Sequence, residues 1–549
     1  MPPKTTAANR PFAITLDVGT SLANLTGSWR TVKPVYNDHL PPCNKQCPAG
    51  ENIQAWLFHA ESGDYKAAWQ QLVQDNPLPA IMGRACYHTC ESACNRSQLD
   101  KPVSIHAVER FLGDLAIREG WKVEPGPASG KKVLVIGAGP SGLSAAYHLA
   151  RLGHEVVIAE AGPKAGGMMR FGIPSYRVPR DVLDAEVQRI LDMGVELRLN
   201  TKIEDIPAAM QAEGFDACFA AVGAHLAKRV DIPAGGAGQI LDAVSVLRGM
   251  ETGAEPPKLG RRVVVYGGGN TAVDVARTAK RLGAEEAVIV YRRTREQMPA
   301  HDFEVEEALE EGVVLHWLRT IKRMDEGGMV VEKMALDENG WPQPTGEYET
   351  LEGDTLVLAL GQDVDTTVIE QVPGVEVNKD RTIKVGPDLQ TGYPGLFCGG
   401  DMVPSERTIT VAVGHGKKAA RHIDAYLRGA AYEPAAKRPT ADYDRLNTWY
   451  YTDAPQTVQP TLDLLRRQTT FDEVTGGLDE TNALFEARRC LSCGNCFECD
   501  NCFGVCPDNA VIKLGPGKRF QFNYDFCKGC GVCAAECPAG VIDMVAEEV

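Results

Sequence analysis

The cysteines of this chain constrain its fold more than any other feature. Fifteen of the 17 cysteines lie in two stretches, residues 43–94 and 490–537, and only Cys218 and Cys398 lie between them. The start of the sequence shows no apolar segment typical of a secretory leader, so these cysteines are expected to be metal-binding thiolates rather than disulfides. The sequence therefore predicts metal chemistry near both ends of a long chain.

The last sixty residues contain a duplicated cysteine spacing. Each copy reads C-x2-C-x2-C-x3-C-P, the spacing by which bacterial ferredoxins hold two [4Fe–4S] clusters, with the fourth cysteine of each copy ligating the other cluster. Structural zinc does not account for the duplicated Cys-Pro. The predicted ligands are Cys496, Cys499, Cys502 and Cys537 for one cluster (cluster 3), and Cys527, Cys530, Cys533 and Cys506 for the other (cluster 4).

The length of 549 residues requires several domains. Apolar residues recur at helical spacing in residues 53–78 and 103–119, whereas residues 133–136 and 263–266 read as buried strands that each lead into a glycine-rich turn and a helix. The expected division is an α-helical iron–sulfur domain (1–128), a first α/β Rossmann-like lobe (129–262 and 360–430), a second such lobe (263–359), a connecting arm (431–485) and an α+β ferredoxin-like domain (486–549).

Both glycine-rich turns match the dinucleotide-binding pattern in its required strand–turn–helix context. Their glycines let the backbone approach a pyrophosphate at the positive helix N-terminus. The first turn contains Gly137, Gly139, Pro140, Ser141 and Gly142, and Glu160 ends the next strand, where it can accept ribose hydroxyls. The second turn contains Gly267, Gly269, Asn270, Thr271 and Ala272, and the next strand leads into Arg292 and Arg293. Because guanidinium groups suit a 2′-phosphate where an acid would select NAD, the second lobe is predicted to bind NAD(P), with NADP favoured.

The N-terminal cysteines follow the pattern C-x3-C-P at residues 43–48 and G-R-x-C-x3-C-x3-C at residues 83–94. This arrangement resembles the N-terminal domain shared by the glutamate synthase small subunit, the first half of dihydropyrimidine dehydrogenase and related ferredoxin:NADP oxidoreductases. That family carries two [4Fe–4S] clusters in this domain, and its cysteine run usually opens with an Arg-Cys-Leu-x-Cys-Gly segment. Here no such segment precedes Cys43, but one stands at residues 489–494.

The resemblance implies a cluster whose ligands come from both ends of the chain. We predict cluster 1 from Cys43, Cys94, Cys490 and Cys493, and cluster 2 from Cys47, Cys86, Cys90 and Glu109. Glu109 matches the position from which the family supplies a non-cysteine ligand, and His106 is a weaker rival. With Glu109 the fifteen cysteines supply sixteen ligands, enough for four clusters. The plainer alternatives are that Glu109 is a solvated helix residue and that Cys490 and Cys493 are spare or bind zinc.

The same resemblance implies that FAD occupies the first lobe. Two further segments resemble those that complete the FAD site in this class: Gly166, Gly167 and Met168, and Gly400 with Asp401. Nicotinamide carries hydride and clusters carry single electrons, so the flavin is expected to connect them. No catalytic acid or base is predicted.

The expected function is therefore electron exchange between NAD(P)H and iron–sulfur centres, as a subunit of a larger complex such as a 2-oxoacid:acceptor or ferredoxin:NAD(P) oxidoreductase. Its partners would be an iron–sulfur protein or catalytic subunits. A net charge of −16 without basic blocks argues against nucleic acid, and no long apolar run indicates a membrane, so a cytoplasmic protein is expected. The alternatives are a glutamate synthase small subunit, which has no need of the C-terminal repeat, and an iron–sulfur redox sensor or scaffold.

Overall fold

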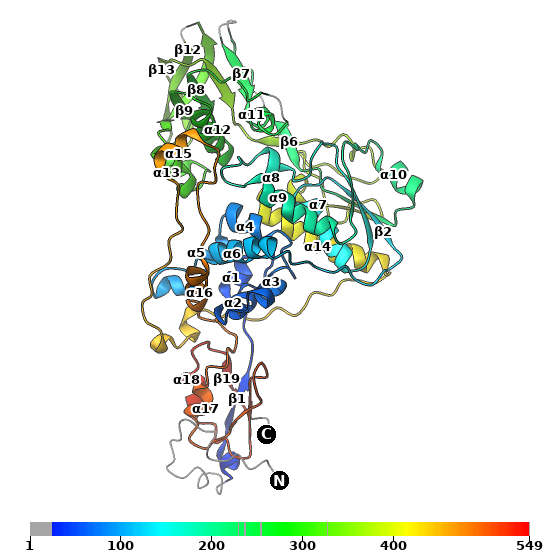
Figure 1. Cartoon of the computed structure of the whole chain (residues 1–549), viewed down its shortest axis with the longest axis vertical. Helices are drawn as coiled ribbons and strands as arrows, with labels where there is room; N and C mark the ends of the chain where they lie inside the picture. Colours follow the sequence, from blue (N-terminus) through cyan, green and yellow to red (C-terminus); the bar gives the residue numbers. More distant parts are fainter. Residues whose placement is uncertain (1–24, 229, 235–237, 253–254, 327, 548–549) are drawn as a thin grey trace.

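The computed structural model describes residues 25–228, 230–234, 238–252, 255–326 and 328–547. Residues 1–24, which include most of the segment predicted to contain no secretory leader, lie outside the described residues. The described parts form an elongated molecule, in which the second lobe, the first lobe, a helical domain and the cysteine-rich C-terminal domain follow one another along the long axis (Figure 1). Among the described residues, no helix is both long and apolar enough to cross a membrane.

Short helices surround a core with two fully buried tryptophans, Trp56 and Trp69, in the N-terminal helical domain. Its elements are α1 (Pro42–Gln46), α2 (Ile53–Glu61), α3 (Tyr65–Leu72), α4 (Pro79–Ala85), α5 (Thr89–Ser92), η4 (Asn95–Gln98) and α6 (Ile105–Arg118). Helices α4 and α6 pack closely, because a Cβ atom at Gly113 would lie only 2.3 Å from the Ala80 nitrogen. A Cβ atom at Gly83 would likewise lie 2.5 Å from the Arg110 nitrogen, so the close packing extends to the part of α4 and α6 that carries Cys86 and Glu109.

The two predicted α/β lobes are confirmed as parallel five-stranded sheets. The first lobe has the strand order β16 (Leu396–Cys398), β5 (Ala217–Ala220), β2 (Lys132–Ile136), β3 (Glu155–Ala159) and β4 (Glu196–Arg198). Its helices are α7 (Pro140–Arg151), α8 (Met168–Phe171), α9 (Arg180–Leu191), α10 (Ile206–Glu213) and α14 (Ile409–Leu427), with η6 (Gly400–Met402). Helix α14 packs along α7 and brings its N-terminus to the helical domain.

The second lobe has the strand order β10 (Val314–Trp317), β9 (Glu286–Tyr291), β8 (Arg262–Tyr266), β14 (Thr355–Leu358) and β7 (Gln239–Asp242). Its remaining elements are α11 (Ala243–Gly249), α12 (Asn270–Arg281), η5 (Arg295–Gln297), α13 (Asp302–Glu310) and the antiparallel strands β11 (Arg319–Asp325), β12 (Gly328–Leu336) and β13 (Pro342–Leu351). Strands β6 (Ala224–Ala227) and β15 (Gln362–Val364) pair between the lobes. The second lobe was expected to begin at residue 263, but β7 and α11 of this lobe precede that residue. Strand β7 was missed because its four residues mix polar and apolar side chains and show no strand pattern.

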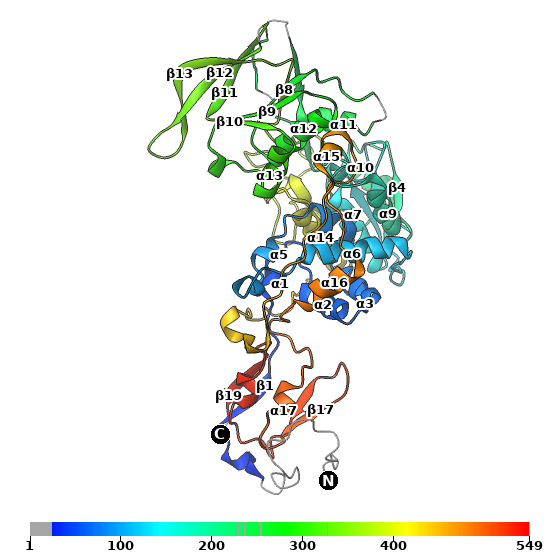
Figure 2. The ribbon, with the colours of Figure 1, turned by 60° about the vertical axis from the view of Figure 1, so that its left-hand side comes forward.

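The connecting arm leaves α14 of the first lobe, reaches the cysteine-rich C-terminal domain, rises to the second lobe and returns to the helical domain; its orange part is visible in Figure 2. It contains η7 (Tyr443–Arg445), η8 (Thr448–Tyr450), α15 (Leu464–Thr469) and α16 (Glu480–Arg488). Arg467 on α15 pairs with Glu310 and the fully buried Glu311 of the second lobe. Helix α16 then packs against α2 and α6 of the helical domain, so the arm ties three domains together.

The C-terminal domain contains α17 (Asn501–Gly504), β17 (Val511–Lys513), β18 (Phe520–Phe522), α18 (Val532–Ala535) and β19 (Ile542–Ala546). It also contains β1 (Val32–Tyr36), preceded by η3 (Thr26–Trp29), because β1 pairs antiparallel with β19 from Val32 opposite Ala546 to Tyr36 opposite Ile542. Residues 26–36 were expected in the helical domain. A five-residue strand whose partner lies at the other end of the chain leaves no local pattern that would reveal the pairing.

Candidate iron–sulfur and nucleotide sites

Two cavities in the C-terminal domain are each lined by four cysteines. One is lined by the predicted cluster 3 set, and the other by the predicted cluster 4 set. Cys499 and Cys530, one from each set, reach the surface. Tyr36 of β1 lines the first cavity, and its hydroxyl lies 3.3 Å from the Cys502 Sγ atom. The N-terminal strand therefore contributes a side chain to a site built from C-terminal cysteines.

A third cavity is lined by residues from two distant parts of the chain. The cysteines that line it are those of the predicted cluster 1: Cys43, Cys94, Cys490 and Cys493. Burial raises the pKa of the Cys490 thiol, and it raises that of Cys493 to about 12. Thiolates in such a place need a compensating cation, which an iron–sulfur cluster supplies. The residues present thus fit the cluster that the motifs imply.

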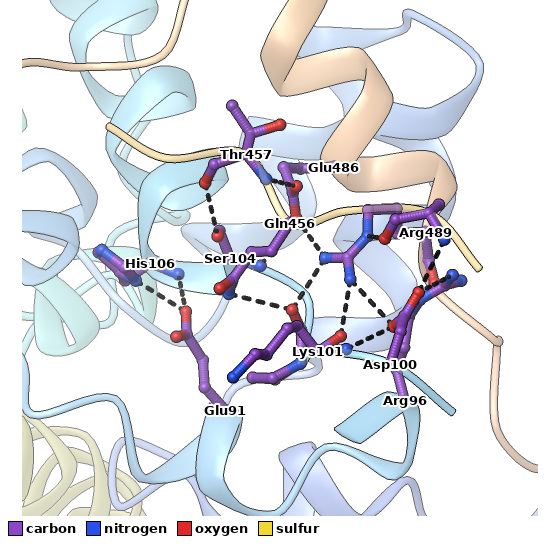
Figure 3. Close-up of polar contacts among 12 residues, drawn as sticks. Glu91, Arg96, Asp100, Lys101, Ser104, His106, Gln456, Thr457, Glu486 and Arg489 are labelled. Atoms are coloured by element: carbon purple, nitrogen blue, oxygen red, sulfur yellow. Dashed lines mark hydrogen bonds and ion pairs between the residues drawn. The ribbon is translucent and has the colours of Figure 1, made fainter. Parts of the chain in front are cut away.

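A buried polar network fixes the segment that carries Cys490 (Figure 3). Arg489 is 2% exposed, and its guanidinium donates to Glu486 at 2.8 Å and to Asp100 at 3.1 Å. It also donates to three backbone oxygens, those of Pro102, Lys101 and Ala454. This one side chain therefore binds α16 to the loop before α6 and to the connecting arm, immediately beside two predicted ligands.

The predicted cluster 2 residues are neighbours within the helical domain, and one of them, Cys86, borders the first lobe. Glu109 is 6% exposed, and its Oε1 accepts a hydrogen bond of 2.7 Å from Asn76. Burial, followed by the nearby Glu51 and Cys86, raises the pKa of Glu109 well above its usual range. The Thr410 hydroxyl, at the start of α14, donates to the Cys86 sulfur at 3.1 Å. A buried carboxylate near several thiolates suits a site that contains a cationic centre.

The rival ligand His106 has both ring nitrogens engaged. Its Nδ1 lies 2.7 Å from Glu91 Oε1, and its Nε2 lies 2.8 Å from Gln459 Oε1. The ring also stacks on His88, with ring centroids 3.7 Å apart. This arrangement favours Glu109 over His106 as the fourth ligand.

The first glycine-rich turn has the geometry of a pyrophosphate cradle. A Cβ atom at Gly142 would lie 1.9 Å from the Gly137 oxygen, so the helix can begin this close to the strand only with glycine. Glu160 accepts hydrogen bonds from the Ala138 and Gly162 nitrogens at 2.8 and 2.7 Å, which aims its carboxylate at the turn. The buried Ser141 hydroxyl has no partner among the described residues.

Two distant segments close over the same turn. A Cβ atom at Gly167 would lie 2.7 Å from the Gly139 Cα, and one at Gly400 would lie 3.1 Å from the Ser141 Cβ. Burial raises the pKa of the neighbouring Asp401 to about 6. The structure thus brings the predicted FAD residues together, and their glycines and unpartnered hydroxyl fit a dinucleotide.

The second turn is bounded by residues of the helical domain. A Cβ atom at Gly269 would meet nothing within 4 Å, which leaves space at the start of α12. The Asn270 side chain accepts from the His301 nitrogen at 3.0 Å and donates to the Tyr87 hydroxyl at 2.5 Å. Tyr87 also stacks on His301, with ring centroids 3.7 Å apart. Tyr87, next to the predicted ligand Cys86, was not anticipated as a neighbour of this site.

An ion pair network between the lobes also escaped sequence reasoning. Arg177 of the first lobe donates to both carboxylate oxygens of Asp274, at 3.0 and 2.9 Å, and pairs with Glu304. Burial raises the pKa of Glu304 to about 7. No local pattern marks such partners, because they meet only after both lobes have folded.

Residues 131–416, just over half of the chain, match the family model described as pyridine nucleotide-disulphide oxidoreductase, which also matches residues 107–214. The chain belongs to this family. Residues 36–121 of this oxidoreductase match the 4Fe-4S cluster domain II of dihydropyrimidine dehydrogenase, and residues 520–543 match a 4Fe-4S binding domain. The resemblance inferred from the motifs is confirmed, and the chain is an NAD(P)-dependent oxidoreductase with FAD and [4Fe–4S] cofactors.

Three relatives cover most of this oxidoreductase. It is 37% identical over 504 residues to the NADP(+)-dependent formate dehydrogenase subunit beta of Moorella thermoacetica, which covers 82% of this chain and 70% of that protein. The chain is 33% identical over 526 residues to the NADPH-Fe(3+) oxidoreductase subunit beta of Geobacter sulfurreducens, and this match covers 86% of this chain and 78% of that protein. The chain is also 31% identical over 419 residues to the glutamate synthase (NADPH) small chain of Escherichia coli, and this match covers 70% of this chain and 89% of that protein.

Proposed function

We propose that this chain is the NAD(P)H-reactive subunit of a larger oxidoreductase and delivers electrons to an iron–sulfur partner through its C-terminal domain. The observation that carries this proposal is the succession of cysteine-lined sites from the first lobe to the far end of the molecule. When bound, FAD exchanges hydride with nicotinamide and single electrons with iron–sulfur clusters. Electron flow from the partner to NAD(P)⁺ would use the same residues.

The contacts between successive sites support a continuous route. The Thr410 hydroxyl links the first lobe to Cys86 of cluster 2. Cluster 1 follows in the same helical domain, and the Asn95 amide lies 3.4 Å from the Cys493 sulfur of that set. Three residues after Cys493, Cys496 opens the cluster 3 set, and Tyr36 lies beside it. The steps from the first lobe to cluster 2 and from cluster 1 to cluster 3 thus run through neighbouring residues, and Cys43 of cluster 1 lies near enough to Cys90 of cluster 2 to raise its pKa.

We further propose four [4Fe–4S] clusters with the ligand sets predicted above, and the predicted domain division with β1 moved to the ferredoxin-like domain and β7 and α11 moved to the second lobe. The three cysteine-lined cavities support clusters 1, 3 and 4. Cluster 2 rests on the burial of Glu109 beside Cys86. The many thiols suit a reducing compartment, so we propose a cytoplasmic location.

NADPH is the proposed nucleotide. Arg292 and Arg293 follow β9, where a 2′-phosphate would meet guanidinium groups. Three relatives have NADP or NADPH in their names. Two of these are named as subunits of a formate dehydrogenase and of an NADPH-Fe(3+) oxidoreductase, so we propose that the partner here is a catalytic subunit carrying its own redox centre.

A glutamate synthase small-chain role is the second candidate. The relative of that name covers 70% of this chain. The two cysteine-lined cavities of the C-terminal domain favour the first proposal, because electron delivery to a large amidotransferase subunit gives no reason for an added two-cluster domain. An iron–sulfur sensor or scaffold is disfavoured by two intact nucleotide-binding turns.

Anaerobic titration of the purified protein with NADPH and, separately, NADH tests the proposal. We expect NADPH to bleach the flavin absorbance and then to produce iron–sulfur EPR signals, with about sixteen iron atoms per chain. About eight or twelve iron atoms would contradict the four-cluster assignment. Absence of flavin reduction by either nucleotide would contradict the electron-transfer function itself.

A further inference from the structure

We propose that Trp341 is a positioning residue of the nucleotide site, which holds Arg293 for the 2′-phosphate of NADPH. The Arg293 guanidinium carbon lies 4.9 Å from the centre of the Trp341 ring. Trp341 is 57% exposed, so burial in an apolar core does not account for its position. This inference rests on the proposed use of NADPH and assigns a residue outside the nucleotide-binding sheet to its recognition.

Hydrogen bonds close the loop that carries Trp341. It connects β12 to β13, and Asp337 Oδ1 accepts hydrogen bonds of 2.9 Å from the backbone nitrogens of Asn339 and Trp341. The Asp337 nitrogen in turn donates to the Trp341 oxygen at 2.9 Å. The indole is therefore presented by a closed loop and not by a free chain.

A chain of contacts connects this loop to the glycine-rich turn. The Gln297 side-chain amide donates to the Gly340 backbone oxygen at 3.0 Å. The Tyr291 hydroxyl donates to the Gln297 backbone oxygen at 2.9 Å. The Tyr291 ring lies against the turn, because a Cβ atom at Gly268 would be 2.5 Å from it. These contacts place Trp341 relative to the second glycine-rich turn.

Two buried polar atoms next to Trp341 lack partners. Arg293 Nε and Gln297 Oε1 make no hydrogen bond to any described residue. The Arg293 Nε is enclosed by protein, but the side chain as a whole is only half-buried, so its terminal Nη–H groups are the ones that can meet the oxygens of a phosphate while the guanidinium lies over the indole. Since Arg293 lies two residues beyond the end of β9, the ligand group that fits is the phosphate on the adenosine ribose.

The test measures binding of 2′,5′-ADP and 5′-AMP to the full-length, cofactor-loaded protein by calorimetry. Trp341→Ala is expected to weaken 2′,5′-ADP about tenfold, while 5′-AMP changes less than about twofold. Trp341→Phe should retain most of the affinity. Tyr348→Ala is the matched control, since Tyr348 lies on β13, is also 57% exposed and contacts Glu332 instead. Flavin and iron contents should equal those of the wild type in all three variants.

The outcomes separate this inference from the proposed function. If wild-type protein prefers 2′,5′-ADP but Trp341→Ala keeps that preference, the role of Trp341 is refuted and the NADPH assignment stands. Equal weakening of both ligands would show that Trp341 contacts adenine only, which also refutes the inference. A wild-type protein without preference for 2′,5′-ADP would overturn the NADPH assignment together with it.

Discussion

Replacement of Arg489 by alanine should open the junction between the two ends of the chain. The substitution leaves Glu486, which is fully buried, with only the backbone nitrogens of Ser104 and Thr457 as donors. Removing one partner of a buried ion pair costs about 3–5 kcal/mol. Since every 1.4 kcal/mol is a factor of ten, local opening should become roughly a hundred to several thousand times more frequent. The same opening would separate Cys490 from Cys43.

Hydrogen–deuterium exchange measures this opening directly. Peptides covering α16 and residues 99–106 should exchange faster by that factor in Arg489→Ala, whereas those of the second lobe should not change. Iron content should fall from about sixteen to about twelve atoms per chain as cluster 1 is lost. Arg488→Ala is the control, because Arg488 is exposed and its side chain makes a single hydrogen bond among the described residues, to the backbone oxygen of Glu61. Unchanged exchange and full iron content in Arg489→Ala would refute the reasoning.

Three further substitutions test the cofactor sites. Glu109→Ala should remove cluster 2, which lowers iron by about four atoms per chain; full iron content would contradict the assigned ligand. Tyr36→Phe removes the hydroxyl beside Cys502, so the reduction potential of cluster 3 should become more negative in an EPR redox titration, and an unchanged potential would argue against that hydrogen bond. Gly142→Ala places a Cβ atom 1.9 Å from the Gly137 oxygen and should yield protein with iron but without FAD, a result that a flavin-replete variant would contradict.

The sequence predicted those features whose residues follow one another or repeat. The ferredoxin spacing, the two glycine-rich turns and Glu160 are local patterns with a fixed chemical reason. Cys490 and Cys493 could be related to Cys43 across the chain only because a family segment was missing at one end and present at the other. In the structure these cysteines line one cavity, as that inference requires.

Features made by tertiary contact gave no such signal. Arg177 is an ordinary arginine in the sequence, and its pairing with Asp274 and Glu304 exists only between folded lobes. Trp341 reaches Arg293 from a strand connection some fifty residues further along the chain. Strand β1 has five residues and a partner at the opposite end of the sequence, so neither periodicity nor turn residues could identify it.

The pairing of β1 with β19 determines when the cysteine-rich end can be completed during synthesis. Translation at about 5–20 residues per second separates the appearance of the two strands by roughly 25–100 s. Throughout that interval Tyr36 has no partner, while the helical domain and both lobes can already fold. The ferredoxin-like domain can therefore be completed only once β19 has been synthesised, and a tag fused close to β1 would disturb the metal content of clusters 3 and 4.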